Sequence, residues 1–100
     1  MTTAKGKLKV GLEYAGKTHA EFTLRAAKVK DTIESTLEVG EGDNLKRMLA
    51  TYARQLVTLG DIPKEHITTA LLAELYDVDL GVIQEAAQDL EKKLMITNQV

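Results

Sequence analysis

The fold is decided by residues 7–25, which read KLKVGLEYAGKTHAEFTLR. Apolar and polar residues alternate in the first half, and the alternation resumes after a turn at Ala15-Gly16-Lys17. A period of two on both sides of a glycine turn predicts a β-hairpin. The apolar face of this hairpin is expected to carry Leu8, Val10, Leu12, Tyr14, Ala20, Phe22 and Leu24.

Helical patterns occupy the rest of the chain. We predict helices over about 28–39, 43–60, 68–76 and 79–95, and no third strand. The predicted fold class is therefore α+β, with an N-terminal β-hairpin followed by three to four helices packed in one small domain over residues 7–95. Residues 1–6 and 96–100 are expected to be a flexible N-terminus and a flexible tail. The outer edges of the hairpin would remain unpaired, which favours association.

The composition of the chain limits the classes of protein to which it can belong. The 100 residues are 44% apolar and carry a net charge of −2, with both signs interspersed. The chain contains no cysteine, which excludes disulfides and thiolate metal sites. No secretory signal and no run long enough to span a bilayer is evident, so we expect a cytoplasmic protein.

No set of residues indicates catalysis or a cofactor. Asp77 and Asp79 form a D-x-D pair, but helix capping explains both without a metal. His19 and His66 are far apart in the sequence and are expected at the surface. The segment 40–44 has two glycines before a helix, yet it lacks the Lys and Ser/Thr of a phosphate loop, so we interpret it as a hinge. We therefore predict no enzyme, no metal and no cofactor.

Several patterns are candidates for contact surfaces. The last helix carries an apolar seam at three- and four-residue steps, formed by Leu80, Ile83, Ala87, Leu90 and Leu94. This spacing is typical of a helix packed against another helix, either in the core or in a partner. On or just after the first helix, Glu34, Glu38 and Glu41 form an acidic edge that is either solvated or in contact with a basic partner. Val29, Ile33 and Leu37 form a narrow apolar stripe on the same helix.

Four stretches carry a resemblance to a known family. They are residues 22–31 (FTLRAAKVKD), 52–60 (YARQLVTLG), 67–75 (ITTALLAEL) and 79–83 (DLGVI). In this order, and over residues 8–95, the chain resembles the tail assembly chaperones of tailed phages and prophages, the Mu-like group of small proteins encoded just before the tape measure gene.

The resemblance implies a non-enzymatic chaperone in the cytoplasm of a bacterial host. Such a protein binds the long helical tape measure protein and helps to recruit tail tube subunits around it. The candidate contact residues are then Leu80, Ile83, Ala87, Leu90, Leu94, Glu34 and Glu38. Homo-oligomerisation through the hairpin edges or the last helix is an additional hypothesis.

A small regulatory nucleic-acid-binding protein is the alternative. It would use the basic residues at the start of the chain and after the hairpin, Lys5, Lys7, Lys9, Arg25, Lys28 and Lys30. Phosphate binding draws on clustered Lys and Arg, and the net charge of −2 makes this the less favoured interpretation.

Overall fold

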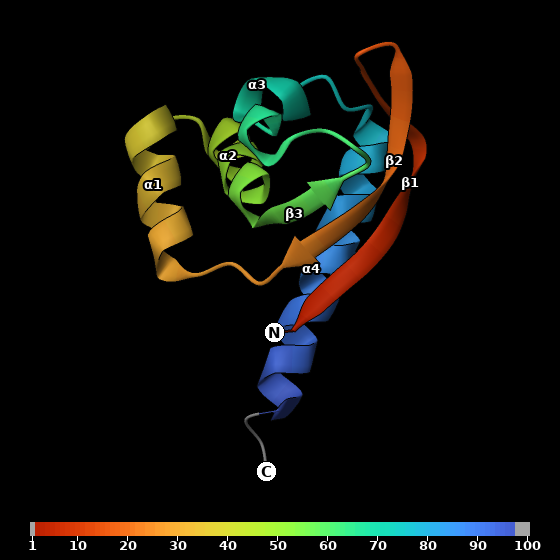
Figure 1. The fold of residues 1–100 in the computed structure, drawn as a ribbon. Helices are drawn as coiled ribbons and strands as arrows, with labels where there is room; N and C mark the ends of the chain where they lie inside the picture. Colours follow the sequence, from red (N-terminus) through yellow and green to blue (C-terminus); the bar gives the residue numbers. More distant parts are fainter. Residues whose placement is uncertain (1, 98–100) are drawn as a thin grey trace.

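Two long antiparallel strands open the chain in the computed structural model, which describes residues 2–97 (Figure 1). β1 (Thr3–Tyr14) pairs with β2 (Lys17–Arg25), from Thr3 opposite Arg25 to Tyr14 opposite Lys17. The turn residues Ala15 and Gly16 have φ of 52° and 78°. Two successive positive φ angles are what a two-residue hairpin turn of type I′ requires. The predicted α+β fold with its N-terminal hairpin is confirmed.

A third strand extends the sheet and corrects the expectation of helix over 43–60. Helix α2 (Asn44–Gln55) ends earlier, and β3 (Leu56–Leu59) pairs antiparallel with β2. The sheet order is β1-β2-β3. Leu56 and Leu59 are fully buried. A three-residue step suits one face of a helix, whereas in β3 the register shift opposite Thr23 and Leu24 lets both side chains reach the core. Residues 56–59 form a strand and do not continue the helix, because pairing with the free edge of β2 gives their backbone N–H and C=O groups hydrogen-bond partners.

Lys64 helps to end α2 at this point. Its ammonium donates to the carbonyl oxygens of Ala53, Arg54 and Leu56, at the exit of the helix. The last carbonyls of a helix have no partner within it and carry partial negative charge. A cation from the following 3₁₀ turn η1 (Lys64–His66) therefore stabilises the change from helix to strand.

β1 contains a bulge that changes which side chains face the core. Lys7 lies opposite Glu21, but Leu12 lies opposite His19, so β1 has extra residues between the two pairs. Gly11 adopts φ of 99°, and a Cβ there would lie 2.5 Å from the Thr18 methyl group. Val10 is consequently 50% exposed, contrary to its predicted place on the apolar face.

His19 is buried, although the alternation predicts it at the surface. Its Nδ1 accepts the backbone N–H of Asp61 at 3.1 Å. Nε2 therefore carries the proton and donates to the Tyr14 carbonyl at 3.1 Å. These two bonds satisfy the ring in the core, so His19 links the hairpin to the loop after β3. His66 is exposed, as expected, and contacts the Tyr14 hydroxyl.

The long helix α4 (Asp77–Thr97) crosses the face of the hairpin and closes the core against β1 (Figure 1). The core is mostly aliphatic, as the composition suggests. It is formed by Ala4, Leu8, Leu12, Phe22, Leu24, Ala53, Leu56, Leu59, Ile62, Ile67, Leu72, Ile83 and Leu90. Short helix α3 (Thr69–Leu72) lies between α2 and α4 in the chain.

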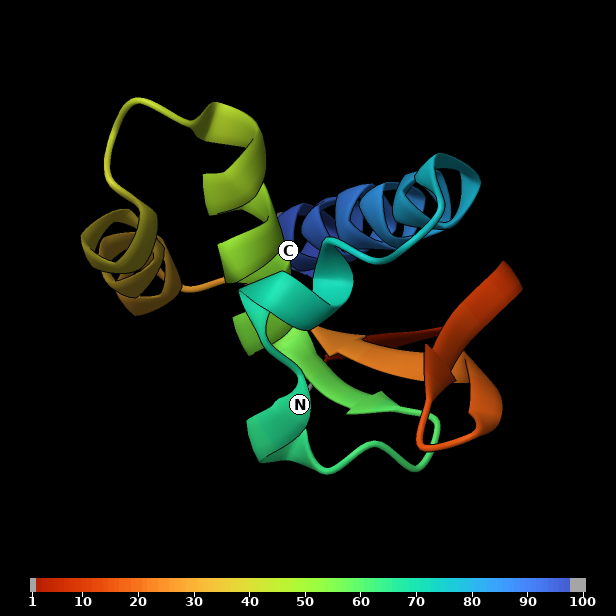
Figure 2. The same ribbon diagram turned by 90° about the horizontal axis from the view of Figure 1, so that it is seen from above.

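Helix α1 (Val29–Val39) lies apart from this core. Figure 2 shows it on the outer side of α2, away from both the sheet and α4. The connections on either side are residues 26–28 and 40–43.

Several element bounds differ from the sequence-based expectation. Residues 3–6, expected to be flexible, belong to β1. The helix expected over 68–76 is a single turn, whereas the last helix begins two residues earlier and includes residues 96 and 97. Residues 98–100 of the expected tail, and residue 1, lie outside the described residues.

Candidate functional site

The predicted seam of the last helix lies mainly in the core. Ile83 and Leu90 are fully buried against the sheet, and Leu80 and Ala87 are partly buried. Only Leu94, near the end of α4, is exposed, at 38%. The seam therefore holds the helix on the hairpin, and most of it is covered within this chain.

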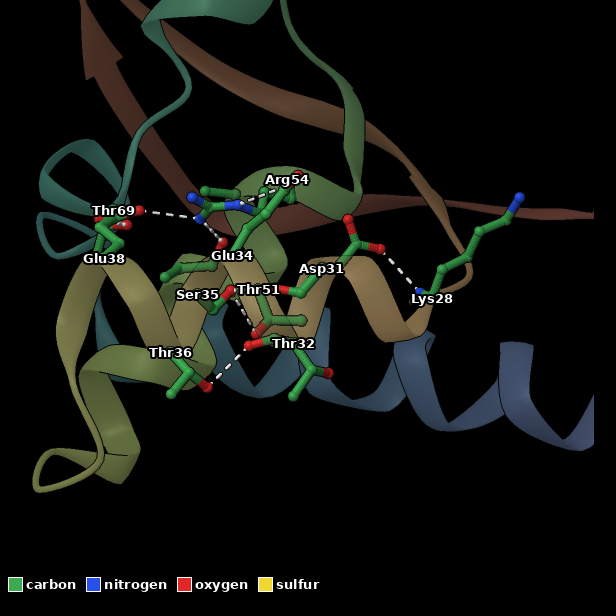
Figure 3. A network of polar contacts seen from close by, with 12 residues as sticks. Lys28, Asp31, Thr32, Glu34, Ser35, Thr36, Glu38, Thr51, Arg54 and Thr69 are labelled. Atoms are coloured by element: carbon green, nitrogen blue, oxygen red, sulfur yellow. Dashed lines mark hydrogen bonds and ion pairs between the residues drawn. The ribbon is translucent and has the colours of Figure 1, made fainter.

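The predicted acidic edge is also engaged within the chain. Arg54 of α2 donates to Glu34 at 3.3 Å and to Glu38 at 2.9 Å. The hydroxyl of Thr69 donates to the other Glu38 oxygen at 2.7 Å. These donors, Thr69 first, lower the pKa of Glu38. The two carboxylates thus attach α1 to α2 and α3 (Figure 3).

The strongest attachment of α1 is a buried ion pair at its first turn. Asp31 is only 1% exposed. Arg25, the last residue of β2, donates through both terminal nitrogens to the two Asp31 oxygens, at 2.8 and 2.9 Å. The backbone N–H of Lys28 donates to the same carboxylate at 2.8 Å, as in a helix-capping interaction. A bidentate pair with a further donor is both strong and specific in geometry.

The middle of α1 is attached by hydroxyl groups. Ser35 is fully buried and donates to the Asp31 carbonyl at 2.7 Å. Thr51 of α2 donates to the Ser35 hydroxyl at 3.0 Å (Figure 3). Asp31 and Ser35 are the buried residues of α1. This helix therefore packs on the body of the protein through its polar face.

The apolar stripe of α1 consequently faces solvent. Val29, Ile33 and Leu37 are 77%, 55% and 82% exposed. They follow one another at four-residue steps, on the face opposite Asp31 and Ser35. We call these three residues the α1 stripe. An amphipathic helix normally buries its apolar side, so this inverted orientation leaves an apolar surface that a partner can cover.

The sequence indicates the stripe but not its exposure. The pattern that could have indicated this exposure is on the opposite face of the helix, where Asp31 and Ser35 repeat at the same four-residue step. The partners of this polar face are Arg25 at the end of β2 and Thr51 of α2, and only the folded structure brings them to α1.

The Arg25–Asp31 pair makes a prediction about pH. The Arg25 hydrogen bonds, helped by the Lys28 N–H, lower the pKa of Asp31 from 3.8 to about 2. A carboxyl with a lowered pKa stabilises the folded state above its unfolded pKa and loses this contribution as the pH falls. Between pH 5 and pH 2, the wild-type protein should lose about 2 kcal/mol more unfolding free energy than Asp31→Asn, which cannot titrate. Urea unfolding at the two pH values measures the difference, and equal losses would contradict the assignment.

The basic residues do not form one cluster. Lys5, Lys7 and Lys9 are exposed on the outer side of β1, whereas both terminal nitrogens of Arg25 are used by Asp31 and by backbone carbonyls. Lys28 and Lys30 lie at the start of α1 and are exposed. The six cations proposed for nucleic-acid binding thus fall into two groups, one along β1 and one, formed by Arg25, Lys28 and Lys30, around a single hollow at the start of α1.

A hollow lies between α1 and α2. It has a volume of about 580 Å³ and is lined by charged residues of both signs. Its main cations, Arg25, Arg54 and Lys64, are already bonded to carboxylates or carbonyls. Among residues 2–97, no three His, Asp or Glu side chains are grouped so as to hold a metal ion. No helix in this part of the chain is long and apolar enough to span a membrane.

Comparison of the chain with protein-family models, with curated proteins and with solved structures finds no match. The functional interpretation therefore rests on the exposure of the α1 stripe and on the polar contacts that attach α1 to the rest of the protein.

Proposed function

We propose that this protein is a non-enzymatic assembly chaperone that binds a helical client through the α1 stripe. The supporting observation is the inverted orientation of α1, whose polar face is bonded to the body while Val29, Ile33 and Leu37 are exposed. The sequence resemblance suggests the client, which is the tape measure protein of a tailed phage. Recruitment of tail tube subunits would follow from the same resemblance.

A helical client suits the shape of this surface. The stripe is one row of side chains at four-residue spacing, which forms a ridge that packs into the groove of another helix. Covering the exposed parts of the three side chains would contribute roughly 3–6 kcal/mol. This is a modest gain for one site, but a long client that binds several copies would be held more tightly through multivalency.

The test is co-expression of a tailed-phage tape measure protein with tagged variants of the chaperone. Replacing Ile33 with serine should reduce the recovered client at least severalfold, because Ile33 is at the centre of the stripe. The melting temperature should change little, since Ile33 is already largely exposed.

The matched control is Val57→Ser, which removes a comparably exposed β-branched side chain from β3. This variant should recover as much client as the wild-type protein. Full client recovery by Ile33→Ser, or equal loss in both variants, would contradict a binding site on α1.

A further inference from the structure

Two charges of opposite sign border the α1 stripe on one side. Lys30 and Glu34 are four residues apart and therefore share one flank of the helix, whereas Thr32 and Thr36 share the other. Lys30 is exposed, and the Glu34 side chain remains 56% exposed although it contacts Arg54. The stripe thus has one charged border and one neutral border.

We infer that, in the absence of client, the α1 stripe is covered by the α1 stripe of a second copy, in an antiparallel pair centred on Ile33. This inference rests on the proposed function, because it assigns a resting partner to the same surface. Ile33 then meets Ile33 of the second copy, and Val29 meets the second copy's Leu37. The outer position of α1 leaves this face open to such an approach (Figure 2).

Charge complementarity favours the antiparallel arrangement. A twofold axis at Ile33 places the charged border of one helix beside the charged border of the other. Lys30 then lies two residues, or about 3 Å along the axis, from the second copy's Glu34, and symmetry gives two such contacts. The two copies of Glu34 also lie about 3 Å apart along the axis, so two attractive contacts oppose one repulsive contact. A parallel pair would place each charged border against the neutral threonine border. Matching charges of this kind determine orientation in paired helices.

The size of the interface predicts a weak pair. Helix α1 has 11 residues and is therefore about 16 Å long. One face of it is much smaller than the ~800 Å² per partner of a stable interface. We expect a dissociation constant roughly in the micromolar to millimolar range. Such a pair would cover the stripe and still be displaced by a client, so self-association and client binding exclude each other.

Disulfide cross-linking tests the geometry directly, because the chain has no cysteine of its own. Ile33→Cys should form a disulfide dimer on mild oxidation on the order of tenfold faster than the control Val57→Cys. Val29→Cys alone should not, because its two copies would be eight residues, or about 12 Å, apart. A mixture of Val29→Cys and Leu37→Cys should cross-link efficiently. Rapid self-linking of Val29→Cys, or no excess over Val57→Cys at position 33, would overturn the inference.

Charge reversal tests the proposed ion pairs by sedimentation equilibrium. Lys30→Glu should weaken the dimer about tenfold, since it places like charges beside each other at both symmetric positions. The double variant Lys30→Glu/Glu34→Lys should restore the affinity to within about threefold of wild type. This double variant also breaks the exposed Glu34–Arg54 ion pair, which contributes little to stability, while Asp31 still anchors the helix. Equal weakening in the single and double variants would contradict the pairing.

The inference and the proposed function can fail separately. A chain that stays monomeric at millimolar concentration, while Ile33→Ser loses the tape measure protein, would overturn only the self-pairing. A dimer that cross-links as expected, while Ile33→Ser keeps the client, would overturn only the chaperone assignment to this surface.

Discussion

Replacing Asp79 with alanine is expected to lower the free energy of unfolding by about 3–5 kcal/mol. The carboxylate is fully buried beneath the bulge of β1. One oxygen accepts the N–H of Lys9 at 2.7 Å, and the other accepts the N–H of Gly11 at 2.8 Å. The N–H of Val10 also points to this carboxylate, at 3.1 Å. Alanine would leave these donors without a partner in a region that α4 covers, and each unsatisfied buried donor is costly.

The matched control is Asp77→Ala, two residues earlier in the same helix. Asp77 is exposed, so its loss removes only a favourable charge at the helix start and should cost less than about 1 kcal/mol. Chemical denaturation gives both values. Hydrogen exchange gives a local measure, since the amides of Lys9, Val10 and Gly11 should lose protection in Asp79→Ala. Similar destabilisation by the two variants would show that Asp79 does not hold the bulge.

Replacing Leu90 with alanine should cost about 2–5 kcal/mol, a large share of the roughly 5–15 kcal/mol of a small domain. Leu90 is 1% exposed and belongs to the core that α4 forms with the sheet. The deletion would remove buried methyl groups and leave a cavity beneath the hairpin. Thermal or urea unfolding measures the loss.

Leu94→Ala is the matched control on the same helix, one turn later. Leu94 is 38% exposed, so the same substitution should cost about 1 kcal/mol or less. If client binding uses α1, the folded fraction of Leu90→Ala should still bind the tape measure protein. Unchanged stability together with lost binding would instead place the contact surface on the seam of α4.

Leu90 lies in the seam that helical periodicity predicts, whereas Asp79 lies in a part of the structure that periodicity describes poorly. The hairpin could be predicted because alternation and a glycine turn are local signals. Asp79 could not be assigned, because helix capping explains its position locally. Its actual partners are about seventy residues away in the chain, at the bulge of β1 against which α4 packs.

The same limit explains the third strand and the buried histidine. Leu56 and Leu59 fit a continued helix, and only the available edge of β2 makes a strand the better solution. His19 alternates with Glu21 and Thr23 on the predicted polar face, yet the loop after β3 offers it a backbone donor at Asp61. In both cases a partner remote in sequence supplies hydrogen bonds that local rules do not predict.

For α1, the sequence by itself determined a helix with an apolar row at 29, 33 and 37 and polar residues at 31 and 35, because helical periodicity assigns residues to faces. It could not determine which face turns inward. The tertiary structure decided that, since Arg25 satisfies the buried Asp31 carboxylate and Thr51 donates to the buried Ser35 hydroxyl. Arg54 adds an ion pair with the partly exposed Glu38. A charged group can be buried only where such partners meet it, and their meeting depends on the folded chain as a whole.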